Sequence, residues 1–163
     1  MKLDTILVPV DGSPLAESAI ATAVDMARPG ASTIMLMRAA EARTLPGVDP
    51  TDAQVRIVGE AEGYLAGVVE RLTREGVAHV QTSVWYGPAA PAIVDAVRLW
   101  KADLVVMTTH GRSGVGRLIL GSVAESVLRG TTVPILLLRA PKAPIEPPAG
   151  MAQAWPVKVP PDV

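Results

Sequence analysis

The sequence predicts a doubly wound α/β fold, in which helices cover both faces of a parallel β-sheet. Short apolar segments alternate with longer segments whose apolar residues recur at helical spacing. The apolar segments are continuous rather than alternating, which is typical of strands that are buried on both faces. Because strand and helix alternate along the chain, the strands are expected to run parallel and to be joined by helical crossovers.

Five apolar segments are predicted to be strands, and turn residues bound several of them. They cover residues 3–10, 33–39, 77–86, 103–108 and 133–138. The first strand ends at Asp11-Gly12 and the third ends at Gly87-Pro88, dipeptides that favour a turn. A loop with two prolines and a glycine is expected between residues 41 and 50.

Four helices are predicted between these strands. The first begins at Pro14 with Ser13 as its N-cap and stops before Pro29. The others cover residues 52–75, 89–101 and 122–129. The second helix has one apolar face, but it also contains three glycines, which weaken the prediction of a helix. The apolar face and the glycines together predict that this helix packs closely against a neighbour. The glycines are Gly59, Gly63 and Gly67.

Composition limits the class of protein. The chain has 163 residues, of which 49% are hydrophobic and 19% charged, so it can bury a core and is not globally disordered. It has no cysteine, which excludes disulfides and thiolate chemistry. Fifteen basic residues against 16 acidic ones leave a net charge of −1, so charge gives no reason to expect nucleic acid or a membrane surface as a partner.

The chain is expected to be one domain, residues 1–139, followed by a tail, residues 140–163. The tail holds seven of the 15 prolines and has no periodicity. No apolar run reaches the roughly 18 residues that a membrane span needs, and no signal peptide is recognisable. The expected location is therefore the cytoplasm.

The carboxyl ends of the first and fourth strands are the expected binding site, because ligands of open α/β sheets bind there. Ser122 and Glu125 have the spacing of a capping box at the start of the last helix, with Val127 and Leu128 turned inward and Gly130 ending the helix. A helix N-terminus preceded by Gly121 also suits a phosphate, with Arg112 and Arg117 as possible cationic contacts. A simple cap is the commoner role of such a Gly-Ser sequence, and Asp11 has a comparable alternative as a turn former.

Three segments together closely resemble the universal stress protein family: residues 6–13 (ILVPVDGS), 103–129 and 133–139. The resemblance implies a five-stranded sheet of order 3-2-1-4-5 and a nucleotide cleft between strands one and four. ATP-binding members carry Gly, two residues, Gly, nine residues, and Gly followed by Ser or Thr. Here Gly111 and Gly121-Ser122 match, but Thr108 replaces the first glycine. Its side chain would either crowd the ribose or add a hydroxyl contact.

The resemblance implies that the cleft binds ATP, or ADP or AMP, with or without Mg²⁺. Base and ribose would lie against the end of the first strand and against Ala39, and Asp11 would lie nearest to a divalent ion. Ribose and phosphates would lie along the segment after the fourth strand and at the start of the last helix. The expected site residues are Pro9, Val10, Asp11, Ala39, Met107, Thr108, His110, Gly111, Arg112, Gly114, Gly121, Ser122 and Val123.

The sequence favours a binding protein over an enzyme, because it lacks a Walker lysine and no acidic residue of the motif is placed to orient His110. His79 is expected to be a surface residue. Two alternatives remain open. One is a stress-response interaction protein in which Thr108 has closed the cleft. The other is a slow ATPase or autophosphorylating protein that uses hydroxyl groups such as Thr109, Ser113 or Ser122.

The fifth strand, residues 133–138, is strongly apolar and lies at the edge of the expected sheet. An open apolar edge is an aggregation hazard, which pairing with the same strand of a second copy would remove. Members of the family dimerise in this way, so a homodimer is expected. The alternative is that the proline-rich tail covers this edge, with Trp155 as its anchor.

Overall fold

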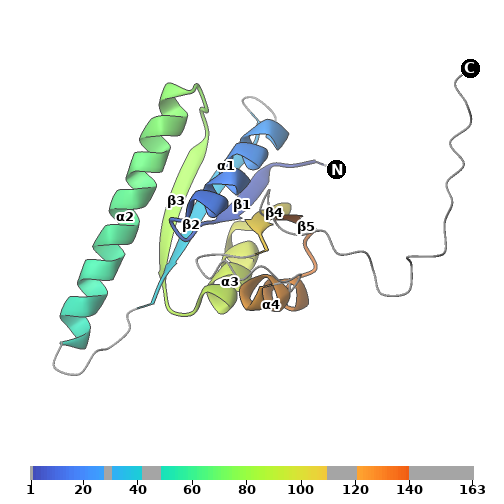
Figure 1. The fold of residues 1–163 in the computed structure, drawn as a ribbon. Coiled ribbons are helices and arrows are strands. Elements are labelled where there is room, and N and C mark those ends of the chain that lie inside the picture. The colour runs from blue at the N-terminus through green and yellow to red at the C-terminus, as the bar shows by residue number, and fades with distance from the viewer. Residues whose placement is uncertain (1, 28–30, 42–48, 110–120, 140–163) are drawn as a thin grey trace, which may run out of the picture.

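The computed structural model describes residues 2–27, 31–41, 49–109 and 121–139. It contains a five-stranded parallel sheet of order β3-β2-β1-β4-β5, which confirms the predicted fold (Figure 1). The strands are β1 (Thr5–Pro9), β2 (Thr33–Ala40), β3 (Val80–Tyr86), β4 (Leu104–Thr108) and β5 (Ile135–Leu138). The helices are α1 (Pro14–Met26), α2 (Pro50–Arg74), α3 (Ala89–Trp100) and α4 (Ser122–Gly130).

Each face of the sheet is covered by a pair of helices. Alternate residues of β1 show the division, because Ile6 and Val8 pack with α1 and α2, whereas Leu7 packs with α3 and α4. All three side chains are fully buried. The central strands are therefore apolar on both faces, which explains their continuous rather than alternating pattern. Within the described residues, no helix combines the length and apolar character that crossing a membrane requires.

The third strand is shorter than predicted because its first residues complete the end of α2. Gly76 has a φ of +87°, a conformation that favours glycine. The backbone N–H of Val77 then donates to the carbonyl of Leu72 at 3.0 Å, a bond typical of a glycine-terminated helix. Residues 77–79 therefore form the exit from α2 rather than the start of β3. His79, in this segment, is exposed as predicted.

The predicted close packing of α2 through its glycines is wrong within the chain. Ala61, Leu65 and Val68 form the buried face of α2. The three glycines lie on the opposite, exposed face, where an added Cβ would meet nothing within 4 Å: Gly59, Gly63 and Gly67. Each costs about 1 kcal/mol of helix stability relative to alanine, a cost that no contact among the described residues explains.

The predicted capping box at the start of α4 is also wrong. The N-cap is Gly121, which provides no side-chain hydrogen bond, and Ser122 is the first residue of the helix. Glu125 does not reach back toward the N-terminus, because its carboxylate pairs with Arg129 at 2.8 Å. Val127 is buried as expected, but Leu128 is 51% exposed. The helix also continues through Gly130 to a C-cap at Thr131.

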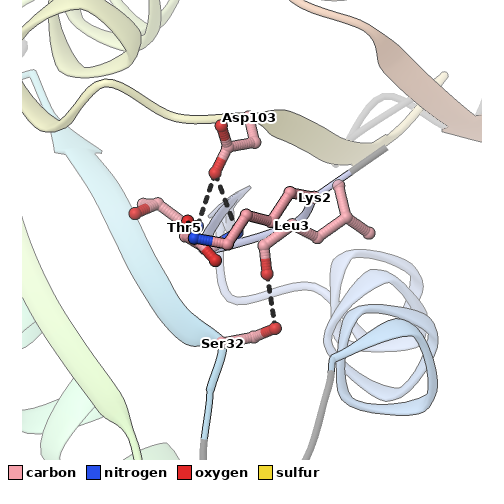
Figure 2. Close-up of polar contacts among 6 residues, drawn as sticks. Lys2, Leu3, Thr5, Ser32 and Asp103 are labelled. Atoms are coloured by element: carbon pink, nitrogen blue, oxygen red, sulfur yellow. Dashed lines mark hydrogen bonds and ion pairs between the residues drawn. The ribbon is translucent and has the colours of Figure 1, made fainter.

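At the amino end of the sheet, two side chains tie β1 to its neighbours (Figure 2). The Asp103 carboxylate accepts hydrogen bonds from the backbone N–H groups of Asp4 and Thr5, both at 2.9 Å. The hydroxyl group of Ser32 donates a hydrogen bond to the backbone carbonyl of Leu3. These contacts fix how β1 enters the sheet between β2 and β4.

At the carboxyl end, β1 and β4 separate. β1 pairs with β2 along its whole length, whereas its pairs with β4 within the described residues are Ile6–Leu104 and Leu7–Val105, both near the amino end. The chain runs from β1 to β2 and β3 on one side, and then crosses back to β4 and β5 on the other. This reversal is the topological switch point at which open α/β sheets bind ligands.

Candidate functional site

A cleft of about 330 Å³ lies at this switch point, a volume in the range of small-molecule sites. It is built from the carboxyl ends of β1, β2 and β4 and from residues near the N-termini of α1, α3 and α4. Its lining residues are Pro9, Val10, Asp11, Ala16, Met37, Ala39, Ala89, Ile93, Met107, Thr108, Thr109, Gly121, Ser122, Val123 and Ala124.

One wall of the cleft is apolar. Met37 and Met107 belong to the cluster under α3 and α4 and are almost fully buried. Ala39 follows Met37 on the same side of β2, and its short side chain leaves space above the strand. Ala89 and Ile93, from the first turns of α3, line the cleft as well. This wall can hold a flat apolar group such as a heterocyclic base.

The end of β1 is held in a tight turn. One carboxylate oxygen of Asp11 accepts from the backbone N–H of Ser13 at 2.9 Å, and the Ser13 hydroxyl accepts from the N–H of Ala16 at 3.1 Å. Gly12, which lies between Asp11 and Ser13, has a φ of +81°, a conformation that favours glycine. Asp11 thus forms the turn and also lines the cleft, so the two interpretations of this residue are compatible.

A polar cluster supports this turn from the other face of the sheet. The Arg38 guanidinium lies about 3.5 Å from the position that a Cβ of Gly12 would occupy, and its Cζ is 5.0 Å from the centroid of the Tyr64 ring. The Tyr64 hydroxyl donates to Glu17 at 3.5 Å, and Glu17 pairs with Arg71 at 3.0 Å. Burial raises the pKa of Tyr64, and the Glu17 carboxylate raises this pKa further, against the opposing effect of the two arginines.

Backbone hydrogen bonds join the end of β4 to the start of α4. The N–H of Thr109 donates to the carbonyl of Leu138 at 2.9 Å, and the carbonyl of Thr109 accepts from the N–H of Gly121 at 2.9 Å. The second bond brings together two residues on either side of the segment 110–120. Thr108, half-buried at the end of β4, therefore lies in the same cleft as Ser122.

Residues at the start of α4 line the cleft, at a helix N-terminus without a side-chain cap. Gly121, Ser122 and Val123 line the cleft, and Gly121 supplies no side-chain cap for them. The N-terminus of α3, which follows Pro88, likewise has no side-chain cap. Unsatisfied N–H groups and the helix dipole both favour an anion at such a position. Because Glu125 pairs with Arg129 one turn further on, its charge is directed away from the cleft.

Every described residue of the predicted site lines this cleft, and its role in binding remains a prediction. His110, Gly111, Arg112 and Gly114 lie outside the described residues, as do Ser113, Arg117 and the tail. Sequence reasoning missed Ala16, Met37, Ala89, Ile93 and Ala124, and it assigned Thr109 only to the alternative phosphorylation chemistry. Strand periodicity could have found Met37, since it precedes Ala39 by two residues and so shares its face. The α3 residues carry no local signal, because only the packing of α3 against β2, β1 and α4 brings them to the cleft.

The fold and the cleft define a doubly wound α/β protein with a cleft at its switch point. The chain belongs to the universal stress protein family, which it matches over residues 2–139. A universal stress protein of Methanocaldococcus jannaschii is 30% identical to it, over 84% of this chain and 82% of its own length.

Solved structures have the same fold. The universal stress protein UspA from Lactobacillus plantarum superposes with a TM-score of 0.72 at 23% identity and covers 85% of this chain and 99% of its own. A universal stress protein in complex with cAMP has a TM-score of 0.66 at 21% identity, and the match covers 85% of this chain and 98% of the other. An Arabidopsis thaliana family member with AMP bound has a TM-score of 0.61 at 14% identity, and the match covers 83% of this chain and 91% of the other.

Proposed function

We propose that this universal stress protein binds an adenine nucleotide, with ATP as the first candidate, and acts as a dimeric sensor or regulator in the cytoplasm. The observation that carries the proposal is a cleft with an apolar wall at one side and the uncapped N-terminus of α4 at the other. Two relatives of the same fold support it, one described in complex with cAMP and one with AMP bound.

In this proposal the base lies on the apolar wall beside Ala39 and Met107. The phosphates lie at the backbone N–H groups of Ser122 and Val123, where the absence of a Cβ at Gly121 allows close approach. The ribose lies between them, near Thr108. Asp11 is the acidic side chain that lines the cleft, so an Mg²⁺ ion that accompanies the phosphates would be nearest to this carboxylate.

The described part of the cleft favours binding over rapid hydrolysis. A general base must reach the proton that it abstracts, and the one carboxylate among the lining residues, Asp11, is already engaged in the turn with Ser13. Autophosphorylation would appear as label retained on the protein after incubation with γ-labelled ATP and denaturation, whereas a slow ATPase would release the label as inorganic phosphate.

Isothermal titration calorimetry on nucleotide-stripped protein tests the proposal, with ATP and Mg²⁺ and then ADP, AMP and cAMP. Gly121→Val places a branched side chain at the phosphate end, and Ala39→Leu fills the base end, so both variants should lose binding. Ser126→Ala, on the exposed side of α4, is the matched control and should bind as the wild type does. If a folded wild-type protein gives no heat with any of the four nucleotides, the proposal fails and the non-nucleotide alternative takes its place.

We also propose that two copies pair through residues 133–138, the segment that contains β5 (Ile135–Leu138). β5 is an edge strand of the sheet, and all of its residues are only half-buried within one chain. Light scattering on the full chain and on a chain truncated after Arg139 tests this pairing. A dimer in both cases supports it. A dimer that appears only after truncation indicates that the tail covers the edge, and a truncated monomer contradicts the pairing.

A further inference from the structure

The outward face of α2 has no partner within the described chain. α2 packs against the sheet through one face and forms the outer margin of the molecule in Figure 1. At 100° per residue, seven exposed residues fall in one strip about 80° wide along its opposite face. They are Asp52, Arg56, Gly59, Gly63, Gly67, Glu70 and Arg74.

The charges of this strip are self-complementary. Asp52 and Arg74 lie equally far from Gly63 on its two sides, and so do Arg56 and Glu70. A two-fold rotation about Gly63, perpendicular to the helix, therefore produces an antiparallel partner in which each acid faces a base. Because the rotation is two-fold, each ion pair forms twice.

The centre of the strip is smooth enough for two helix backbones to approach closely. A Cβ at Gly59, Gly63 or Gly67 would meet nothing within 4 Å in the part of the chain that the structure describes, so the described fold of one copy does not require glycine there. The same rotation places Gly59 of one copy opposite Gly67 of the other. Glycine at these positions lowers helix propensity, but it removes the side chains that would keep two helices apart.

We propose that this face of α2 is a docking surface for a second copy of the chain, packed antiparallel about a two-fold axis at Gly63. In a single copy, Arg56 pairs with Glu60 at 3.0 Å and Arg74 with Glu70 at 4.0 Å. Both pairs are exposed, and such pairs contribute little, so their exchange for contacts between copies is not costly. Val55, which is 67% exposed beside the strip, would be covered as the helices meet.

This surface is separate from β5. α2 packs on β3 and β2, whereas β5 lies at the opposite edge of the sheet. The two proposed contacts are thus independent, and a protein that uses both would form assemblies larger than a dimer.

Cross-linking of the full-length chain tests the proposed axis, because the chain has no cysteine of its own. Gly63→Cys places two thiols at the axis, within reach of a disulfide. Thr73→Cys is the matched control on the same helix, since its two copies would lie about 30 Å apart in the antiparallel arrangement. We expect mild oxidation to cross-link the first variant and not the second. Equal cross-linking of the two, or none in Gly63→Cys, overturns the proposal.

Charge reversal in the Gly63→Cys background tests the register. Arg56→Glu places acid against acid and should weaken association about tenfold at low salt. Adding Glu70→Arg restores the opposite charges and should restore cross-linking. Circular dichroism checks that each variant keeps its helix. A single reversal without effect, or a double variant that stays as weak as the single one in a folded chain, contradicts the antiparallel packing.

Discussion

At the amino end of the sheet, the carboxylate of Asp103 satisfies two backbone N–H groups, whereas at the carboxyl end the first turn of α4 has no side-chain cap. The two ends also differ in spacing, because β1 and β4 pair near the amino end and separate toward the cleft. One end closes its polar groups within the chain and stabilises the fold. The other end has no side-chain cap on α4 and is where the proposed nucleotide would bind, so changes at the two ends should affect different properties.

The largest expected effect comes from Asp103→Ala at the amino end. It removes the acceptor of two charge-assisted hydrogen bonds from the N–H groups of Asp4 and Thr5, so the free energy of unfolding should fall by about 2–3 kcal/mol. Urea denaturation measures this change. Asp95→Ala removes a carboxylate from an exposed pair with Arg98 and is the control, with an expected change near zero. If the folded Asp103→Ala protein lost nucleotide affinity without losing stability, this result would contradict the assignment of stability to the amino end and of binding to the carboxyl end.

The two ends of α4 allow the same comparison of binding with stability, because Gly121 lines the cleft and Gly130 packs against α3. A Cβ at Gly130 would lie 2.6 Å from Cγ2 of Val94. Gly130→Ala should therefore lower the free energy of unfolding by about 1–2 kcal/mol, and Val94→Ala in the same chain should relieve the overlap. Gly59→Ala, which meets nothing within 4 Å, is the matched control and should not destabilise a single copy. An equal loss of stability in both glycine variants would exclude the overlap as the cause.

Thr108 tests the carboxyl end directly. If its hydroxyl contacts the ribose, Thr108→Val should weaken nucleotide binding by about 1 kcal/mol, roughly fivefold, at nearly constant side-chain volume. Thr108→Ser keeps the hydroxyl and should retain the affinity. Calorimetry with ATP and with AMP measures both variants. Tighter binding by Thr108→Ser than by the wild type would instead indicate that the methyl group crowds the site.

The smallest expected effect concerns Tyr64, which supports the turn at the carboxyl end through Arg38. Because the pKa of Tyr64 is raised above the ordinary tyrosine value of 10.0, the folded state keeps the phenolic proton at a pH where the unfolded chain has lost it. The stabilising contribution is therefore present below pH 10 and declines as the pH rises through the raised pKa. Urea denaturation of the wild type and of Tyr64→Phe across this range measures it. Parallel pH profiles of the two proteins would contradict the shift.

Much of the fold could be predicted because its determinants are local. Apolar segments marked the strands, although β3 also contains polar residues, and Ser13-Pro14 marked the start of α1 with its cap. The positions of the candidate site residues followed from the resemblance to the universal stress protein family, together with the rule that ligands bind at a switch point. Where predicted boundaries differ from the structure, as at residues 77–79, a terminating glycine has extended the end of a helix at the expense of the next strand.

The sequence by itself determined the order and type of the elements, because side-chain periodicity and turn or capping residues are properties of neighbouring positions. Only the tertiary structure decided that the glycines of α2 face outward, that Asp103 binds the amides before β1, and that Ala89 and Ile93 line the cleft. It also made Gly121, and not Ser122, the cap of α4. Each of these features depends on how elements distant in the chain pack together, and local spacing carries no information about which distant face a residue will meet.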